Sequence, residues 1–124
     1  MYERKIPLNL NCGVGLTMEI IGGKWKPCLI YSIKQGARRP SELQRRNPTA
    51  TRRVLNQQLK ELEEYGVITK VIYAELPPKV EYFLTEFGET LLPIINAIEE
   101  WGNQHQELFK QMTEKQKEIH LKTA

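Results

Sequence analysis

The sequence predicts a single, mainly helical α+β domain in which several helices are followed by one two-stranded β-hairpin and a final helix. A chain of 124 residues with 40% hydrophobic residues is long enough to bury one core. Leucines recur at helical spacing within residues 48–66. Two runs rich in β-branched residues, 67–74 and 80–85, flank a pair of prolines, which is typical of a hairpin.

The stretch 48–66 is predicted to contain one amphipathic helix. Its apolar stripe consists of three leucines at positions i, i+4 and i+7: Leu55, Leu59 and Leu62. Thr51 is the expected N-cap, and Gly66 is the expected end. The other face carries side chains suited to base edges and phosphates: Arg52, Arg53, Asn56, Gln57 and Lys60. A solvated surface helix is the alternative interpretation of that face.

The distribution of charge favours a polyanionic partner. The net charge of the whole chain is +3. Residues 38–60 contain seven bases and one acid, a net charge of +6, whereas residues 61–124 contain six bases and twelve acids. A chain polarised in this way is expected to present one positive face to nucleic acid. A solvated run of charges would more often mix the two signs.

The composition offers little for catalysis, metal binding or membrane insertion. The candidate thiols and imidazoles are Cys12, Cys28, His105 and His120, and their spacing matches no metal site. There is no Asp, no glycine-rich phosphate loop and no nucleophile set, so we expect neither an enzyme nor a cofactor. No stretch approaches the ~18 apolar residues of a membrane span. The N-terminus has no apolar signal core, and we expect a cytoplasmic protein without a membrane partner.

The N-terminal third is expected to hold an arm and two helices. Residues 1–15 are predicted to be a flexible arm because glycines interrupt them. Helices are predicted over 16–21 and 24–35. Trp25 has core spacing, although a ligand pocket near a dimer interface is an alternative place for it. Cys28 falls on an apolar helix position and is expected to be buried and inert.

A short helix, a tight turn and a long helix follow, which is the helix-turn-helix pattern. The short helix covers 41–46 with Ser41 as N-cap, and Asn47-Pro48 forms the turn. The hairpin after the long helix is then the wing of a winged helix, with Lys79 near its tip. Arg38, Arg39 and Ser41 are expected to hold phosphates, and Lys79 is expected to reach the DNA backbone.

The last predicted helix runs from residue 86 to about 106, with a bend or interruption at Pro93. It carries a wide apolar stripe: Leu91, Leu92, Ile95, Ile98 and Trp101. The stripe predicts a dimer interface, and packing within one chain is the alternative. We accordingly assign 24–85 to the winged core, 86–110 to dimerisation and 111–124 to a polar tail.

Several motifs together resemble a known family. The motifs are Ile21-Gly22-Gly23-Lys24-Trp25, Gly36-Ala37-Arg38-Arg39, Leu59-Lys60-Glu61-Leu62-Glu63, Gly66-Val67-Ile68, Pro77-Pro78-Lys79-Val80-Glu81-Tyr82-Phe83-Leu84-Thr85 and Trp101-Gly102. In this order they resemble the HxlR-type winged helix-turn-helix transcription regulators, which are relatives of the MarR group. The resemblance covers residues 12–102, most of the chain.

The resemblance implies a homodimer, joined through its first and last helices, that binds a pseudo-palindromic operator in double-stranded DNA. It implies base and backbone contacts from the long helix, beginning at Thr51, and from the wing. It also places Cys12 where relatives carry a cysteine that senses oxidants or electrophiles. We therefore expect a repressor with a thiol-reactive or small-molecule signal. A winged-helix module that binds proteins rather than DNA is the competing hypothesis.

Overall fold

The computed structural model describes residues 11–123, apart from the side chains of residues 122 and 123. It divides into two units, residues 1–92 and 93–124, and each is described by itself. The elements are α1 (Gly13–Ile21), α2 (Lys26–Lys34), α3 (Pro40–Arg46), α4 (Arg52–Glu64), β1 (Ile68–Tyr73), β2 (Lys79–Leu84), α5 (Glu86–Glu89) and α6 (Leu92–Thr123). The mainly helical α+β class with one β-hairpin is confirmed.

The core of the first unit lies where α2, α3 and α4 pack together, with the hairpin joined to α2 and α4. Its largest fully buried side chains are Leu29, Ile30, Ile33, Leu43, Leu55, Leu59, Leu62, Val67 and Ile68. The leucine stripe predicted for the long helix is therefore confirmed as buried. Removing such a side chain from water stabilises the fold by roughly 1.5–3 kcal/mol.

Local signals fix both ends of α4. The hydroxyl of Thr51 accepts a hydrogen bond from the backbone N–H of Val54 at 3.1 Å, which caps the helix as predicted. After the helix, Gly66 adopts a φ of +75°, a left-handed conformation that glycine adopts without steric cost. The polypeptide then turns directly into β1.

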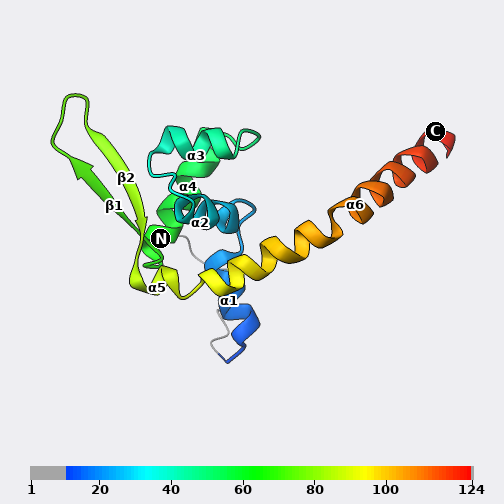
Figure 1. The fold of residues 1–124 in the computed structure, drawn as a ribbon, viewed down its shortest axis with the longest axis horizontal. Coiled ribbons are helices and arrows are strands. Elements are labelled where there is room, and N and C mark those ends of the chain that lie inside the picture. Colours follow the sequence, from blue (N-terminus) through cyan, green and yellow to red (C-terminus); the bar gives the residue numbers. More distant parts are fainter. Residues whose placement is uncertain (1–10, 124) are drawn as a thin grey trace. The chain divides into compact units, whose positions relative to one another are not determined.

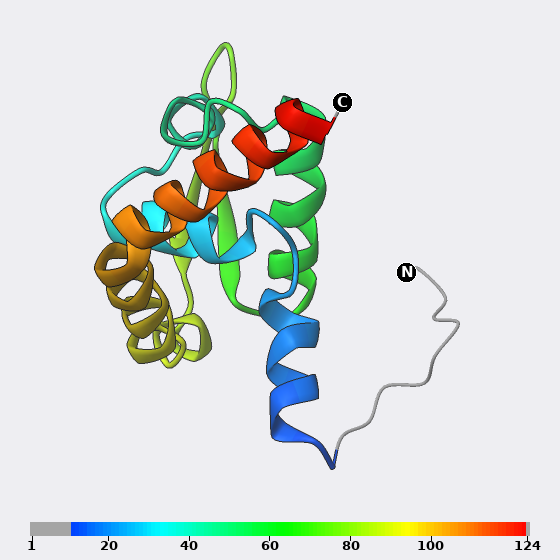
Figure 2. The same ribbon diagram turned by 90° about the vertical axis from the view of Figure 1, so that its right-hand side faces the viewer.

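The hairpin is antiparallel, with Ile68 opposite Leu84 and Tyr73 opposite Lys79. Its base is fastened to the helical core, because the N–H of Tyr82 donates to the carbonyl of Arg38 at 2.8 Å. The tip projects past the helices on the side where α3 lies (Figures 1 and 2). The two predicted strands are confirmed to within a residue or two of each end.

The N-terminal elements differ from the prediction. Helix α1 begins at Gly13, so the expectation of irregular backbone at Gly13 and Gly15 is wrong. The cause is a cap: the Cys12 sulfur accepts a hydrogen bond from the N–H of Gly15 at 3.3 Å. The remainder of the predicted arm, residues 1–10, lies outside the described residues.

Two side chains predicted to be buried near α2 are not. Trp25 is half-buried, because it precedes the first turn of α2 and helical periodicity does not govern its direction. Cys28 is exposed, so its predicted burial is wrong. Successive helical residues differ by about 100°, which places Cys28 to one side of the buried Leu29.

The helix predicted from residue 86 is interrupted shortly before Pro93, as expected, and so forms two helices, α5 and α6. Thr85 caps α5 by accepting from the N–H of Gly88 at 2.9 Å, and α5 ends after one turn. Pro93 lies in the first turn of α6, where proline costs no backbone hydrogen bond. Helix α6 then continues to Thr123, so the predicted tail at residues 111–124 is helical over almost its whole length.

Candidate nucleic-acid interface

The polar face of α4, defined as Arg52, Arg53, Asn56, Gln57 and Lys60, is exposed at every position. The leucines of the opposite stripe are at most 1% exposed. Because they are packed into the core, α4 cannot rotate far enough to turn the polar face inward. Guanidinium, amide and ammonium groups on one exposed helical face are the groups that contact guanine, adenine and phosphate.

The turn before α4 orients one of these arginines through a residue that the sequence analysis missed. The Gln44 amide oxygen accepts a hydrogen bond from Arg52 Nε at 3.3 Å, while its NH2 group donates to the Ala50 carbonyl at 2.5 Å. Asn47 is buried in the same turn and donates to the Leu43 carbonyl at 2.9 Å. The sequence signal for the role of Gln44 is a glutamine in the short helix that precedes the capped long helix.

The start of α3 is built differently from the prediction. The helix begins at Pro40, and Arg39 is the N-cap, so Ser41 lies inside the first turn and is not the cap. The Glu42 carboxylate accepts from the N–H of Arg39 at 2.9 Å and from that of Arg38 at 3.3 Å. These backbone hydrogen bonds hold the pKa of Glu42 below its ordinary value of 4.5. Arg39 and Ser41 are exposed.

Arg38 makes internal contacts. Its guanidinium stacks on the Phe83 ring, 4.7 Å from the centroid, and donates to the Tyr82 carbonyl at 3.4 Å. These contacts join the start of α3 to β2. The structure thus separates Arg38 from the exposed cations with which the sequence analysis grouped it.

Lys79 lies at the first position of β2, at the base of the wing loop. Its ammonium is 3.9 Å from Glu81 Oε1 and 5.1 Å from the Tyr73 ring centroid. A hydrogen bond to Glu81 raises the pKa of Tyr73, with burial and the Glu81 charge adding to the effect. Lys79 therefore faces the strand pair, and its charge is partly compensated.

A hollow of about 450 Å³ lies between the wing loop and the helix-turn-helix. Its walls combine cations with the apolar loop tip: Arg39, Pro40, Ser41, Arg52, Glu75, Leu76, Pro77, Pro78, Lys79 and Val80. Leu76 is 99% exposed at that tip, and the sequence analysis did not single it out. The wing and the start of α4 thus border one continuous concave surface.

The predicted interface residues of the last helix fall into two groups. Leu91 and Ile95 are buried, at 7% and 2% exposure, and Leu92 is half-buried. Ile98 is 46% exposed and Trp101 is 66% exposed, and the Trp101 indole stacks on His105 with 4.3 Å between ring centroids. Further along α6 the exposed apolar series continues with Leu108, Phe109, Met112 and Ile119.

Across 11–123, no helix is both long enough and apolar enough to cross a membrane. The same part of the chain contains no cluster of three or more His, Cys, Asp or Glu side chains arranged to bind a metal ion.

Comparison with known proteins defines the class to which this fold and this surface belong. The chain is 43% identical over 112 residues to YybR of Bacillus subtilis (strain 168), an uncharacterized HTH-type transcriptional regulator, covering 89% of this chain and 90% of that protein. It resembles the redox regulator HypR in its reduced form with a TM-score of 0.75 and 43% identity. This match covers 81% of this chain and 99% of that chain. The match to the oxidized form of HypR has a TM-score of 0.72 and 47% identity, and it covers 75% of this chain and 96% of that chain.

The fold and these relatives define a winged helix-turn-helix transcriptional regulator, not an enzyme. The sequence model of the HxlR-like helix-turn-helix family matches residues 20–110. The chain belongs to that family, as the resemblance implied.

Proposed function

We propose that this protein is a sequence-specific DNA-binding repressor that acts as a homodimer on a pseudo-palindromic operator. The observation that supports it most is the exposed polar face of α4 opposite a fully buried leucine stripe. A helix with this division is suited to enter the major groove, where each base pair shows a distinct pattern of donors and acceptors. Two copies would place their helices in successive grooves, about one helical turn apart.

Different groups serve affinity and specificity. Arg53, Asn56 and Gln57 are the candidates for base edges, since they project from the first two turns of α4. Arg39, Ser41, Arg52 and Lys60 are the candidates for phosphates, with the wing loop beside them. Phosphate contacts release counterions from the duplex, so binding should weaken steeply as salt rises.

The proposal also includes contact between two copies of the chain and a signal that controls their DNA binding. The exposed apolar series on α6 supports contact with a second copy. A helix that faces only water does not need a row of exposed apolar side chains, and such a row marks an interaction surface. The exposed thiol of Cys12 and the likeness to a redox regulator support a thiol-reactive signal, and a small molecule is the other candidate. Such a signal acts if its affinity differs between two states of the dimer.

The test is duplex binding by variants of the polar face. Arg53→Ala and Gln57→Ala should each weaken binding to the best duplex selected from a randomised library by at least about 1 kcal/mol, roughly fivefold. Lys34→Ala removes an exposed cation at the end of α2 and serves as the control. If the protein binds no duplex, a protein-interaction module replaces this proposal. Unchanged binding by both variants would instead show that the reading face is misassigned.

A further inference from the structure

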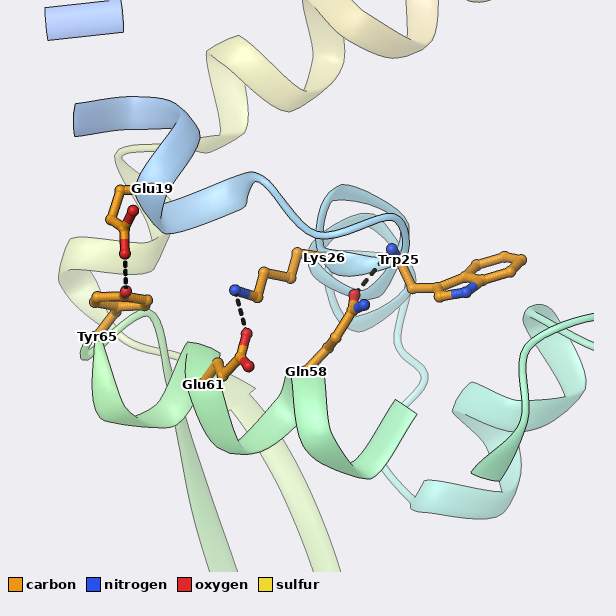
Figure 3. A network of polar contacts seen from close by, with 6 residues as sticks. All are labelled: Glu19, Trp25, Lys26, Gln58, Glu61 and Tyr65. Atoms are coloured by element: carbon orange, nitrogen blue, oxygen red, sulfur yellow. Dashed lines mark hydrogen bonds and ion pairs between the residues drawn. The ribbon is translucent and has the colours of Figure 1, made fainter. Parts of the chain in front are cut away.

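A second set of polar side chains lies on the side of α4 that faces α1 and α2, away from the polar face described above. Three pairs join the helices: Tyr65 with Glu19, Glu61 with Lys26, and Gln58 with the backbone of Trp25 (Figure 3). We call these six residues the α4 anchor. None of the six is among the proposed DNA contacts. Their pairing could not be recognised from the spacing of residues along the sequence.

The central pair is a buried charge whose position requires an explanation. Lys26 is 4% exposed, and its ammonium lies 2.5 Å from Glu61 Oε2 and 5.6 Å from the Tyr65 ring centroid. It is also the first residue of α2, where the helix dipole disfavours a cation. Desolvation cancels most of the stability that such a pair could contribute. What the pair does provide is one fixed geometry between α2 and α4.

The second contact joins α4 to the start of α2. The Gln58 amide oxygen accepts a hydrogen bond from the Trp25 N–H at 2.9 Å, which serves one of the backbone donors that a helix start leaves without an intrahelical partner. A Cβ at Gly23 would lie 3.0 Å from that oxygen and 3.1 Å from Lys26 Cδ. Glycine therefore permits the close approach, while the Trp25 indole points away from it (Figure 3).

The third contact adds α1. The Tyr65 hydroxyl donates to Glu19 Oε1 at 2.7 Å, from the residue that directly follows α4. Gln58 and Tyr65 are seven residues apart, about 10 Å along a helix at 1.5 Å per residue. Anchors separated by this length oppose both rotation and tilt of α4, which a single contact could not do.

Small rotations of α4 matter for base recognition. A side chain ending about 5.5 Å from the helix axis moves by about 2 Å when the helix turns by roughly 20°. That displacement breaks a hydrogen bond to a base edge, since such bonds weaken steeply beyond about 3.2 Å. Phosphate contacts tolerate it better, because the backbone charge is repeated and carries no sequence information.

We propose that Lys26, Gln58 and Tyr65 are positioning residues that set the rotation of α4 and thereby the preference of this protein for its operator over other DNA. The inference rests on the DNA binding proposed above. Loss of an anchor contact lowers the affinity for the operator far more than the affinity for unrelated duplex. A purely structural contact would instead lower thermal stability and affect both duplexes equally.

The experiment compares two duplexes of equal length at one KCl concentration: the best sequence selected from a randomised library, and its shuffled version. Tyr65→Phe deletes one hydroxyl, and Lys26→Met deletes the charge but keeps the stem. Each should reduce the ratio of the two affinities at least about fivefold, while affinity for the shuffled duplex changes less than about twofold. Tyr31→Phe and Lys34→Met remove the same groups from α2 outside the α4 anchor, and as controls they should leave the ratio unchanged.

A double variant separates positioning from stability. Lys26→Met/Glu61→Met removes both charges, the buried ammonium of Lys26 and the carboxylate of Glu61, whose side chain is 38% exposed. It should restore the unfolding midpoint, since no buried charge is left without its partner. The affinity ratio should stay low. Recovery of the ratio together with the midpoint would overturn the inference, as would wild-type ratios for Tyr65→Phe and Lys26→Met. Wild-type protein that binds neither duplex would overturn the proposed function itself.

Discussion

Two adjacent arginines show how little a residue type says about its role. Arg38 stacks on Phe83 and donates to the Tyr82 carbonyl, so its charge joins the helical core to β2. Arg39 is exposed beside the hollow between the wing loop and the helix-turn-helix. A substitution at one should therefore alter the attachment of the wing, and at the other the electrostatic attraction of DNA.

Arg39→Gln should make duplex binding less dependent on salt. Each phosphate contact contributes about 0.9 to the slope of log affinity against log salt, so the slope should fall by about 0.9 per protomer. Arg38→Gln is the comparison: the slope should stay constant while the unfolding midpoint falls, since a cation–aromatic contact is lost. Affinities measured by fluorescence anisotropy over a KCl series give both slopes. Equal slopes for wild type and Arg39→Gln would contradict the assignment.

Cys12 combines a structural contact with a chemically reactive group. Its sulfur caps α1 by accepting from the Gly15 N–H at 3.3 Å, and the thiol is exposed. A serine oxygen is among the preferred N-caps, so Cys12→Ser should keep α1 intact while removing the thiol chemistry. We expect this variant to bind DNA normally and to lose any response to diamide. If the response persists in Cys12→Ser and disappears in Cys28→Ser, the sensing thiol is Cys28 of α2 instead.

At the scale of elements, α3 depends on Glu42 and should respond to acid. Backbone N–H groups of Arg39 and Arg38 lower the pKa of Glu42 from 4.5. A carboxyl whose pKa is lowered by folding stabilises the protein above its ordinary pKa, and this contribution is lost as pH falls through the lowered value. Glu42→Gln should therefore unfold at a lower temperature at neutral pH and lose less stability on acidification. Unfolding midpoints that run parallel for both proteins below about pH 4.5 would contradict this.

The elements that the sequence predicted well are those with local signals. Thr51 and Gly66 fix the ends of α4 through a cap and a positive φ, and both act within a few residues. The hairpin likewise follows from β-branched runs around two prolines. Helix α1 was missed at its start because a cysteine cap outweighed the glycines that argued against helix.

Side-chain roles that depend on distant partners could not be predicted. Arg38 contacts residues more than forty positions away, and Gln58 meets Trp25 across 33 positions. Spacing along one helix identifies a face but not which neighbour that face will meet. This is why the polar face of α4 was identified from the sequence, whereas the α4 anchor behind it was not.

At the scale of the whole molecule, the proposed recognition of an operator depends on a second copy of the chain. A single helix reaches few base pairs, and a second copy doubles the contacts while fixing their spacing. The exposed apolar residues of α6 are spaced by four, three, seven and four positions from Ile94, through Ile98, Trp101 and Leu108, to Met112. That period is the seam of paired helices, and it continues past the end of the family match at residue 110.

Leu108→Lys should therefore separate the protomers without unfolding them. Leu108 is 54% exposed in one chain, so the substitution leaves no cavity but would place a charge inside a helix pair. Sedimentation should show a monomer, and affinity for the selected duplex should fall at least about tenfold, because linked half-sites reinforce each other. Lys110→Ser, on the same turn of α6, should leave both unchanged. A Leu108→Lys protein that remains dimeric would show that the copies meet elsewhere, and one that is monomeric yet binds normally would show that a single α4 suffices.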